Sequence, residues 1–176
     1  MKNIYKKNGL VVWSQREIEF REYLVDTLSL ELRSVLENEN RGWLFQRIES
    51  SCLIPSEFVS KEYDKSDFFS IGELCLRPET TDGSYKYAEN LIDEGLKPPF
   101  VVWQAGKSFR NEGENPTKKM RLKEFYQCEF QCFYGADTKN DYATTVSSQL
   151  FNFIDSITSK KVRIIESDRL PSYSES

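Results

Sequence analysis

The sequence of 176 residues contains no histidine. This absence excludes imidazole acid–base catalysis, catalytic triads built on histidine, and histidine metal sites. Any chemistry must therefore use carboxylates, arginine, lysine, tyrosine or backbone groups. Long apolar runs are also absent. The apolar stretch near the N-terminus extends only from Gly9 to Trp13. We therefore expect neither a membrane span nor a signal peptide.

Cysteine is scarce, and its four positions form no C-x-x-C pair: Cys52, Cys75, Cys128 and Cys132. Each lies in an apolar run, which predicts free, buried thiols in a cytoplasmic protein. The net charge of −4 argues against a protein that coats nucleic acid or lies on an acidic membrane surface. The length and the hydrophobic content of 39% predict a single folded domain over 1–176.

Apolar spacing predicts three helices and several strands. Helical periodicity covers 15–36, with Ser14 as its cap, 84–94, with Gly95 as its stop and cap candidates at 80–82, and 142–158. Extended segments are expected at 43–55, 74–77, 100–112, 121–134 and 162–165, and a loop at 61–69. This order predicts an α+β fold with an antiparallel sheet covered by helices on one face.

The two long strand-like segments each place polar side chains on one face. Even positions from 126 to 134 are apolar or aromatic, whereas odd positions of 121–134 are mostly polar. A loop at 113–120 joins this segment to 100–112. The loop predicts that Glu112 pairs with Arg121, Arg110 with Lys123, and Ser108 with Phe125. Directly opposed residues share a face. The common face then carries Arg110, Glu112, Arg121, Lys123, Phe125, Gln127, Glu129 and Gln131.

Two interpretations of this polar face remain open from alternation alone. It can be a solvent-facing sheet surface that cross-strand ion pairs stabilise. It can also be a site for a flat, anionic ligand, because Gly106 and Ser108 would leave room, Phe125 can stack and arginines can bind phosphates.

The same residues resemble motif 2 of class II aminoacyl-tRNA synthetases, an F-R-x-E strand, a variable loop and then R-x-x-x-F-x-x-x-(D/E). Here the motif is Phe109-Arg110-Asn111-Glu112, followed by Arg121 to Glu129 with Phe125 at the aromatic position. A second stretch, LRPET at 76–80, is similar to a segment of glycyl-tRNA synthetases. The resemblance extends from about Gly9 onward, with motif 2 at about 100–134. It implies a class II synthetase-like antiparallel sheet flanked by helices.

The resemblance implies an ATP site on motif 2. Arg110 would be the catalytic residue and would hold the α-phosphate together with the amino-acid carboxylate. Glu112 would bind the adenine amino group, Phe125 would stack on the adenine, and Arg121 would reach the outer phosphates. Mg²⁺ would bridge the phosphates largely through its own waters, so that no protein residue is expected as a metal ligand.

The resemblance also implies an amino-acid site, in which Glu79 and Glu129 would hold the ammonium group of glycine while Arg110 meets its carboxylate. A small pocket ringed by carboxylates suits glycine, because selectivity then comes from excluding any side chain. Catalysis would rest on positioning and charge stabilisation, which agrees with the missing histidine.

The sequence departs from the family at two places. Arg41-Gly42-Trp43 resembles the opening of motif 1, in a region of about 15–55, but Glu49 stands where that motif has its proline and Pro55 comes later. After Ser167 there is no G-x-G-x-(E/D)-R pattern of motif 3, and no anticodon-binding domain is expected. The sequence thus resembles a C-terminally incomplete class II core.

Two functions follow as expectations. The first is an ATP-dependent glycine–tRNA ligase of protein biosynthesis, with weak tRNA affinity because the chain is acidic. The second is a non-catalytic synthetase-like module that binds a nucleotide, an RNA or a protein partner. An incomplete sheet would expose apolar surface, so a homodimer, or a partner protein that completes the sheet, is also expected.

Overall fold

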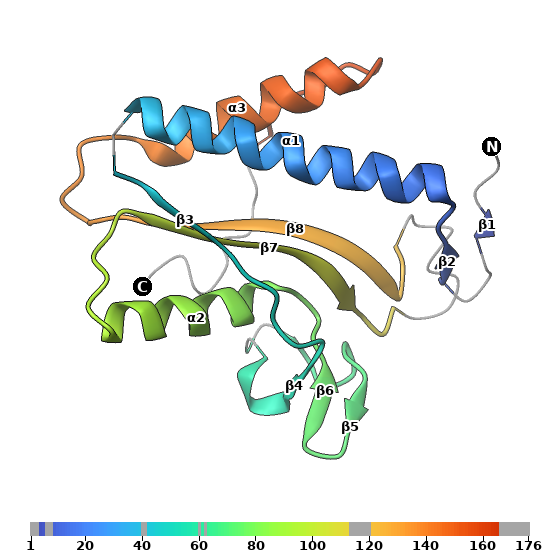
Figure 1. Ribbon diagram of the computed structural model, residues 1–176. Helices are drawn as coiled ribbons and strands as arrows, with labels where there is room; N and C mark the ends of the chain where they lie inside the picture. Colours follow the sequence, from blue (N-terminus) through green and yellow to red (C-terminus); the bar gives the residue numbers. More distant parts are fainter. Residues whose placement is uncertain are drawn as a thin grey trace.

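A computed structural model of the chain describes residues 4–5, 9–39, 42–59, 61, 63–112 and 121–165. Arg41 of the motif 1-like segment, the predicted loop at 113–120 and the stretch after Ser167 lie outside these ranges. The described chain forms a central sheet of β3, β7 and β8 with helices on both sides (Figure 1). Helices α1 and α3 lie on one face of this sheet, and α2 lies on the other.

The elements follow the chain in the order β1, β2, α1, β3, β4, η1, β5, β6, α2, β7, β8 and α3. The helices are α1 (Gln15–Glu39), the short 3₁₀ helix η1 (Ser56–Phe58), α2 (Thr81–Asp93) and α3 (Tyr142–Ile157). The strands are β1 (Ile4–Tyr5), β2 (Val11–Val12), β3 (Leu44–Arg47), β4 (Leu53–Pro55), β5 (Ser70–Ile71), β6 (Leu74–Leu76), β7 (Phe100–Phe109) and β8 (Glu124–Phe133).

All three predicted helices are confirmed, and their ends follow from local chemistry. The Ser14 hydroxyl donates to Glu17 Oε2 over 2.7 Å, and Glu17 Oε2 also accepts from the Ser14 backbone N–H over 2.8 Å. These bonds satisfy donors at the start of α1 and lower the pKa of Glu17. Gly95, with a φ of 95°, follows the end of α2 in the left-handed region, where glycine carries no steric penalty.

The sheet differs from the prediction in three respects. It is mixed, because β3 pairs with β7 in parallel while β7 and β8 are antiparallel. Residues 162–165, predicted as a strand, form none. Helices cover both faces rather than one, since Ala88 of α2 packs with Phe100 and Val102 in a second apolar cluster.

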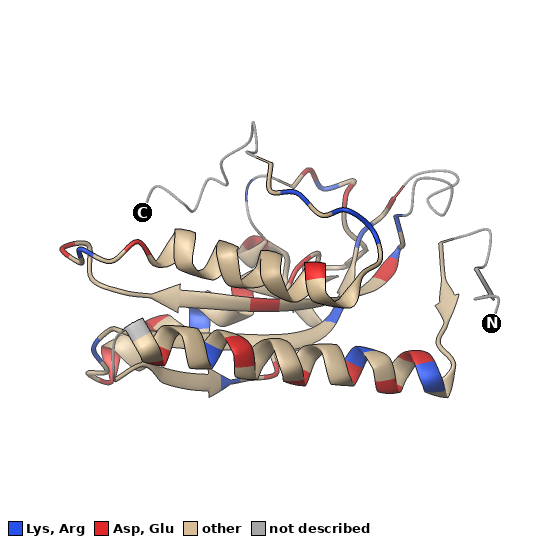
Figure 2. Ribbon diagram, turned by 90° about the horizontal axis from the view of Figure 1, so that it is seen from above, with Lys and Arg blue, Asp and Glu red and all other residues tan. Residues whose placement is uncertain are grey.

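The main core lies between the sheet and the pair α1 and α3. Its buried members are Leu32, Leu36, Trp43, Val101, Trp103 and Tyr142, with partly buried Cys128, Phe130 and Cys132 packed against them. The apolar even positions of β8 thus face these helices, as alternation predicts. Figure 2 shows charged residues at intervals along α1. In α3, by contrast, Asp155 is the only charged residue.

All four cysteines are free, but they are not all buried. Cys75 is buried, Cys128 and Cys132 are partly buried, and Cys52 is exposed, which corrects the expectation of four buried thiols. Burial raises the pKa of Cys128 and of Cys132 to about 11, so both thiols stay protonated at neutral pH. Within the described ranges, no helix is both long enough and apolar enough to cross a membrane.

Candidate functional site

The paired strands β7 and β8 form the floor of the candidate site. Ser108 lies opposite Phe125, and Gln104 lies opposite Glu129. Beyond the strand ends, the Arg110 N–H donates to the Lys123 carbonyl over 3.1 Å. The predicted register is therefore confirmed, and Arg110, Phe125 and Glu129 belong to one face.

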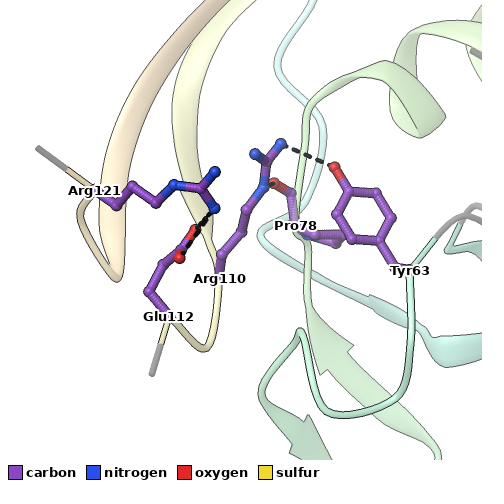
Figure 3. Close-up of polar contacts among 5 residues, drawn as sticks. All are labelled: Tyr63, Pro78, Arg110, Glu112 and Arg121. Carbon is purple, nitrogen blue, oxygen red and sulfur yellow. Dashed lines mark hydrogen bonds and ion pairs between the residues drawn. The ribbon is translucent and has the colours of Figure 1, made fainter. Parts of the chain in front are cut away.

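Arg110 connects this floor to the segment before α2 (Figure 3). Its Nε donates to the Pro78 carbonyl over 3.2 Å, and its Nη2 donates to the Tyr63 hydroxyl over 2.8 Å. Tyr63 in turn donates to Glu79 Oε2 over 2.9 Å. The guanidinium also lies 5.2 Å from the centre of the Phe125 ring and 5.4 Å from that of Tyr63, within cation–π range.

Tyr63 was missed at the sequence level because it lies in a polar stretch predicted to be a loop. The signal that could have found it is a single aromatic residue among charged neighbours. In the structure it is partly buried and joins Arg110 to Glu79.

Glu112 and Arg121 pair with each other at the open end of the hairpin. Arg121 Nη1 lies 3.3 Å from Glu112 Oε2, and the Arg121 side chain is 65% exposed. Figure 3 shows Arg121 and Arg110 on the same side of the hairpin. Two guanidinium groups thus lie at this end of the hairpin, an arrangement suited to an anionic ligand.

Carboxylates gather at the start of α2. Glu129 of β8 accepts hydrogen bonds from the Thr81 hydroxyl over 2.8 Å and from Gln127 Nε2 over 2.9 Å. Glu79, which precedes the helix, is 7% exposed. Both carboxylates act electrostatically on Asp82 in the first turn of α2, so the structure brings the two predicted ammonium-binding residues to one region.

Asp82 belongs to this group, although the sequence indicated it only as a capping candidate. Burial, and then the charges of Glu79 and Glu129, raise the pKa of Asp82 from 3.8 to about 7, against the opposing effect of Lys86. Because the folded state holds this proton more tightly than the unfolded state, Asp82 makes the folded state less stable as pH rises between these two values. Thr80 stands at the N-cap position, but its side chain makes no capping hydrogen bond.

Among the described residues, no group of three or more cysteine, aspartate or glutamate side chains is arranged to hold a metal ion.

Comparison with known proteins finds partial sequence matches to glycine–tRNA ligases. No protein-family model matches the sequence. The chain is 36% identical over 83 residues to the glycine–tRNA ligase of Mycoplasmopsis synoviae, an alignment that covers 46% of this chain and 18% of the ligase. It is 30% identical over 118 residues to the glycine–tRNA ligase of Cutibacterium acnes, with 66% and 24% covered. The chain thus spans less than a quarter of these curated relatives.

Comparison with solved structures establishes the architecture of this chain. Two structures of pyrrolysyl-tRNA synthetase from Desulfitobacterium hafniense superpose with TM-scores of 0.54 and 0.55 at 15% identity. They cover 73% and 74% of this chain, and the chain covers 44% and 47% of them. The chain has the fold of a class II aminoacyl-tRNA synthetase core. The sequence matches and the fold together make it a synthetase-like core.

On the same face of the floor of this synthetase-like core lies a buried cation, Arg77, which is 2% exposed. Its Nη1 donates to the Ser50 carbonyl over 2.7 Å and to the Ser50 hydroxyl over 2.6 Å, and its Nε donates to the Lys107 carbonyl over 2.8 Å. A methyl group at Gly106 would collide with the Arg77 guanidinium. The expectation that Gly106 leaves room for a ligand is therefore wrong, because Arg77 fills that space.

Gln104 attaches α2 to the same network. It is 1% exposed, its Nε2 donates to the Thr80 carbonyl over 2.8 Å and to the Ser84 hydroxyl over 3.0 Å, and its Oε1 accepts from Ser50. The turn that carries Thr81 and Asp82 is therefore fixed to β7. A glutamine inside an apolar strand was the available sequence signal for this role.

Replacing Gly106 by alanine tests this packing. Arg77 cannot move away without losing its hydrogen bonds, so we expect Gly106→Ala to lower the free energy of unfolding by about 2 kcal/mol. Gly135→Ala is the matched control, because the added methyl would meet only the carboxylate end of Asp137, and should change stability by less than about 0.5 kcal/mol. Urea denaturation measures both. Equal stability of the two variants would contradict the tight contact.

Proposed function

We propose that this synthetase-like core binds ATP and glycine on the shared face of β7 and β8 and activates glycine as its adenylate for transfer to tRNA. The observation that carries the proposal is the chain of contacts from Arg110 through Tyr63 to Glu79. It connects the arginine of the F-R-x-E motif to the glutamate of the L-R-P-E-T segment. The partial matches to glycine–tRNA ligases support the choice of amino acid.

In the proposed reaction, a carboxylate oxygen of glycine attacks the α-phosphorus of ATP. The bond from that phosphorus to the bridging oxygen breaks, and pyrophosphate leaves. Arg110 would stabilise charge on the α-phosphate and the glycine carboxylate, while Arg121 would bind the outer phosphates. Glu112 would bind the adenine amino group and Phe125 would stack on the ring. Mg²⁺, when bound, would neutralise phosphate charge and be held mainly by the phosphates themselves.

The ammonium group of glycine would lie by Glu79 and Glu129 at the start of α2. Arg110 reaches Glu79 through Tyr63, so one side chain at the boundary of the two subsites could meet both the α-phosphate and the glycine carboxylate. Holding the two reactants in this way can supply much of the rate enhancement without a general base. Residues 1–176 would act as a single domain in the cytoplasm. This domain by itself would bind tRNA only weakly.

A second candidate is a synthetase-like module without adenylation activity. The guanidinium of Arg110 covers the Phe125 ring, and Arg121 pairs with Glu112. The side chains assigned to ATP thus contact one another in the structure. A module that binds a different ligand would keep these contacts.

Glycine-dependent exchange of pyrophosphate into ATP separates the two candidates. We expect exchange that requires glycine, excludes alanine and serine, and falls at least about 100-fold in Arg110→Ala, which loses charge stabilisation. Glu129→Gln should raise the KM for glycine by about tenfold or more, because one charge partner of the ammonium is lost.

Matched controls are Arg33→Ala on the outer side of α1 and Glu124→Gln on β8, whose side chains pair with Glu37 and Lys107 away from the site. Both should retain exchange. No exchange in the unaltered chain, with ATP binding still measurable by calorimetry, would favour the non-catalytic module.

We further propose that the chain forms a homodimer or binds a partner protein along apolar surface. Phe20, Tyr23 and Leu30 of α1 are 54%, 57% and 67% exposed and recur on one side of the helix. Ile154 and Ile157 of α3 are also exposed, and β8 is an edge strand in the described sheet. Such surface favours association.

Sedimentation equilibrium tests self-association. We expect a dimer that Leu30→Asp dissociates, because a charge would enter the apolar contact. Leu53→Asp, at a leucine of β4 that is 40% exposed, should leave the dimer intact. A monodisperse monomer at all concentrations would contradict self-association.

A further inference from the structure

A short segment before β5, residues 63–68, is hydrogen-bonded to the end of β7. The Asn111 backbone N–H donates to the Asp67 carbonyl over 2.7 Å, and Asn111 Nδ2 donates to the Ser66 carbonyl over 3.0 Å. The preceding residue, Arg110, donates to the Tyr63 hydroxyl of the same segment (Figure 3). Asn111 is the variable residue of the F-R-x-E motif and has no role in the proposed ATP and glycine sites. Two successive residues of the motif thus hold residues 63–68, which we call the strap.

The strap has a turn and an apolar anchor of its own. The Asp64 N–H donates to Asp67 Oδ2 over 3.0 Å, and the Asp67 N–H donates to the Asp64 carbonyl over 2.8 Å. Such bonds close a turn locally. Phe68, at the end of the strap, is 7% exposed. Asn111 therefore binds a preformed turn, and that turn lies next to Tyr63 in the chain.

A cavity of about 840 Å³ borders the strap. Its lining combines Tyr63, Lys65 and Phe68 of the strap with residues of η1 and of the hairpin formed by β5 and β6. A segment that borders a cavity gains few packing contacts there, so its position depends more on its hydrogen bonds. The bonds from Arg110 and Asn111 therefore help to keep Tyr63 in place between Arg110 and Glu79.

We propose that Tyr63 and Asn111 are positioning residues, which hold the Arg110 guanidinium and the Glu79 carboxylate in one arrangement and make the binding of ATP and of glycine mutually favourable. This inference rests on the proposed function. Asn111 fixes the strap, and the Tyr63 hydroxyl joins Arg110 to Glu79. Neither residue has to touch a ligand.

The coupling follows from the order of these contacts. A nucleotide that fixes Arg110 also fixes Tyr63 and, through it, Glu79. Glycine then binds to groups that are already ordered, so its binding costs less conformational entropy. By linkage, glycine improves the affinity for the nucleotide by the same factor.

Calorimetric titration of glycine with and without adenosine α,β-methylene triphosphate measures this factor, because the analogue cannot release pyrophosphate. We expect the unaltered chain to bind glycine at least about fivefold more tightly when the analogue is present. The factor should fall below about twofold in Tyr63→Phe, which lacks the hydroxyl, and in Asn111→Ala, which lacks the amide donor. A general structural defect would weaken both titrations and leave their ratio unchanged, so the ratio isolates positioning.

The matched controls are Tyr87→Phe and Asn152→Ala. Tyr87 is an exposed tyrosine of α2, and Asn152 is an exposed asparagine of α3. Each control removes the same chemical group as one of the test variants, at a position away from the strap. Both should keep the full coupling factor.

Tryptic cleavage tests the docking of the strap without any ligand. Lys65 is exposed, but the bond that follows it lies in the turn that Asn111 holds. We expect Asn111→Ala to speed cleavage after Lys65 at least about threefold, because the loss of one hydrogen bond makes opening of the turn easier. Asn152→Ala should be cleaved there as slowly as the unaltered chain.

Equal cleavage rates in Asn111→Ala and Asn152→Ala, or a coupling factor that survives in Tyr63→Phe, would overturn the inference and leave the proposed ATP and glycine sites intact. Failure of the unaltered chain to bind glycine or the analogue would overturn the proposed function, and the coupling with it. The cleavage rates would still decide in that case whether Asn111 holds the strap.

Discussion

The pairing of β7 with β8 is the interaction on which the site depends. Side chains alternate between the faces of a strand, so the register alone decides that Arg110, Phe125 and Glu129 share a surface. A shift of one residue would turn the polar side chains of β8 toward the core and expose Cys128 and Phe130. The apolar face of the same strands is held by Leu32, Leu36 and other residues of the main core. Core packing therefore enforces the arrangement of the polar face.

Charged side chains gather at two ends of the floor, and Glu112 pairs with Arg121 at the open end of the hairpin. Arginines lie at the open end of the hairpin, and carboxylates lie where α2 begins, with Arg110 joined to Glu79 through Tyr63 at the boundary. On the same face, the buried Arg77 donates through Nη1 to the backbone and hydroxyl oxygens of Ser50. This division suits a ligand pair with an anionic group at one end and an ammonium at the other. A solvent-facing surface stabilised only by ion pairs would not need a buried arginine packed on it.

Sequence patterns predicted the register, the three helices and the face of the site, because alternation and helical period are local properties. They did not predict that β3 joins β7 in parallel, since strand partners distant in sequence leave no local signal. The strand expected at 162–165 was wrong for a related reason, as apolar alternation over four residues does not supply a pairing partner. Gly106 was interpreted as room for a ligand, but a glycine can equally mark space filled by a distant side chain, here Arg77. Tyr63 and Asp82 gain their importance from tertiary contacts that a linear sequence does not display.

The central claim is that one surface binds both the nucleotide and glycine. Calorimetric titration with a non-hydrolysable glycyl-adenylate analogue, a glycylsulfamoyl adenosine, tests it most directly. If both subsites lie on this floor, the analogue should bind at least about 100-fold more tightly than ATP or glycine alone, because it spans the two. The corresponding alanyl compound should bind at least about tenfold more weakly than the glycyl one. An affinity equal to that of adenosine alone, or the same affinity for both compounds, would contradict the account.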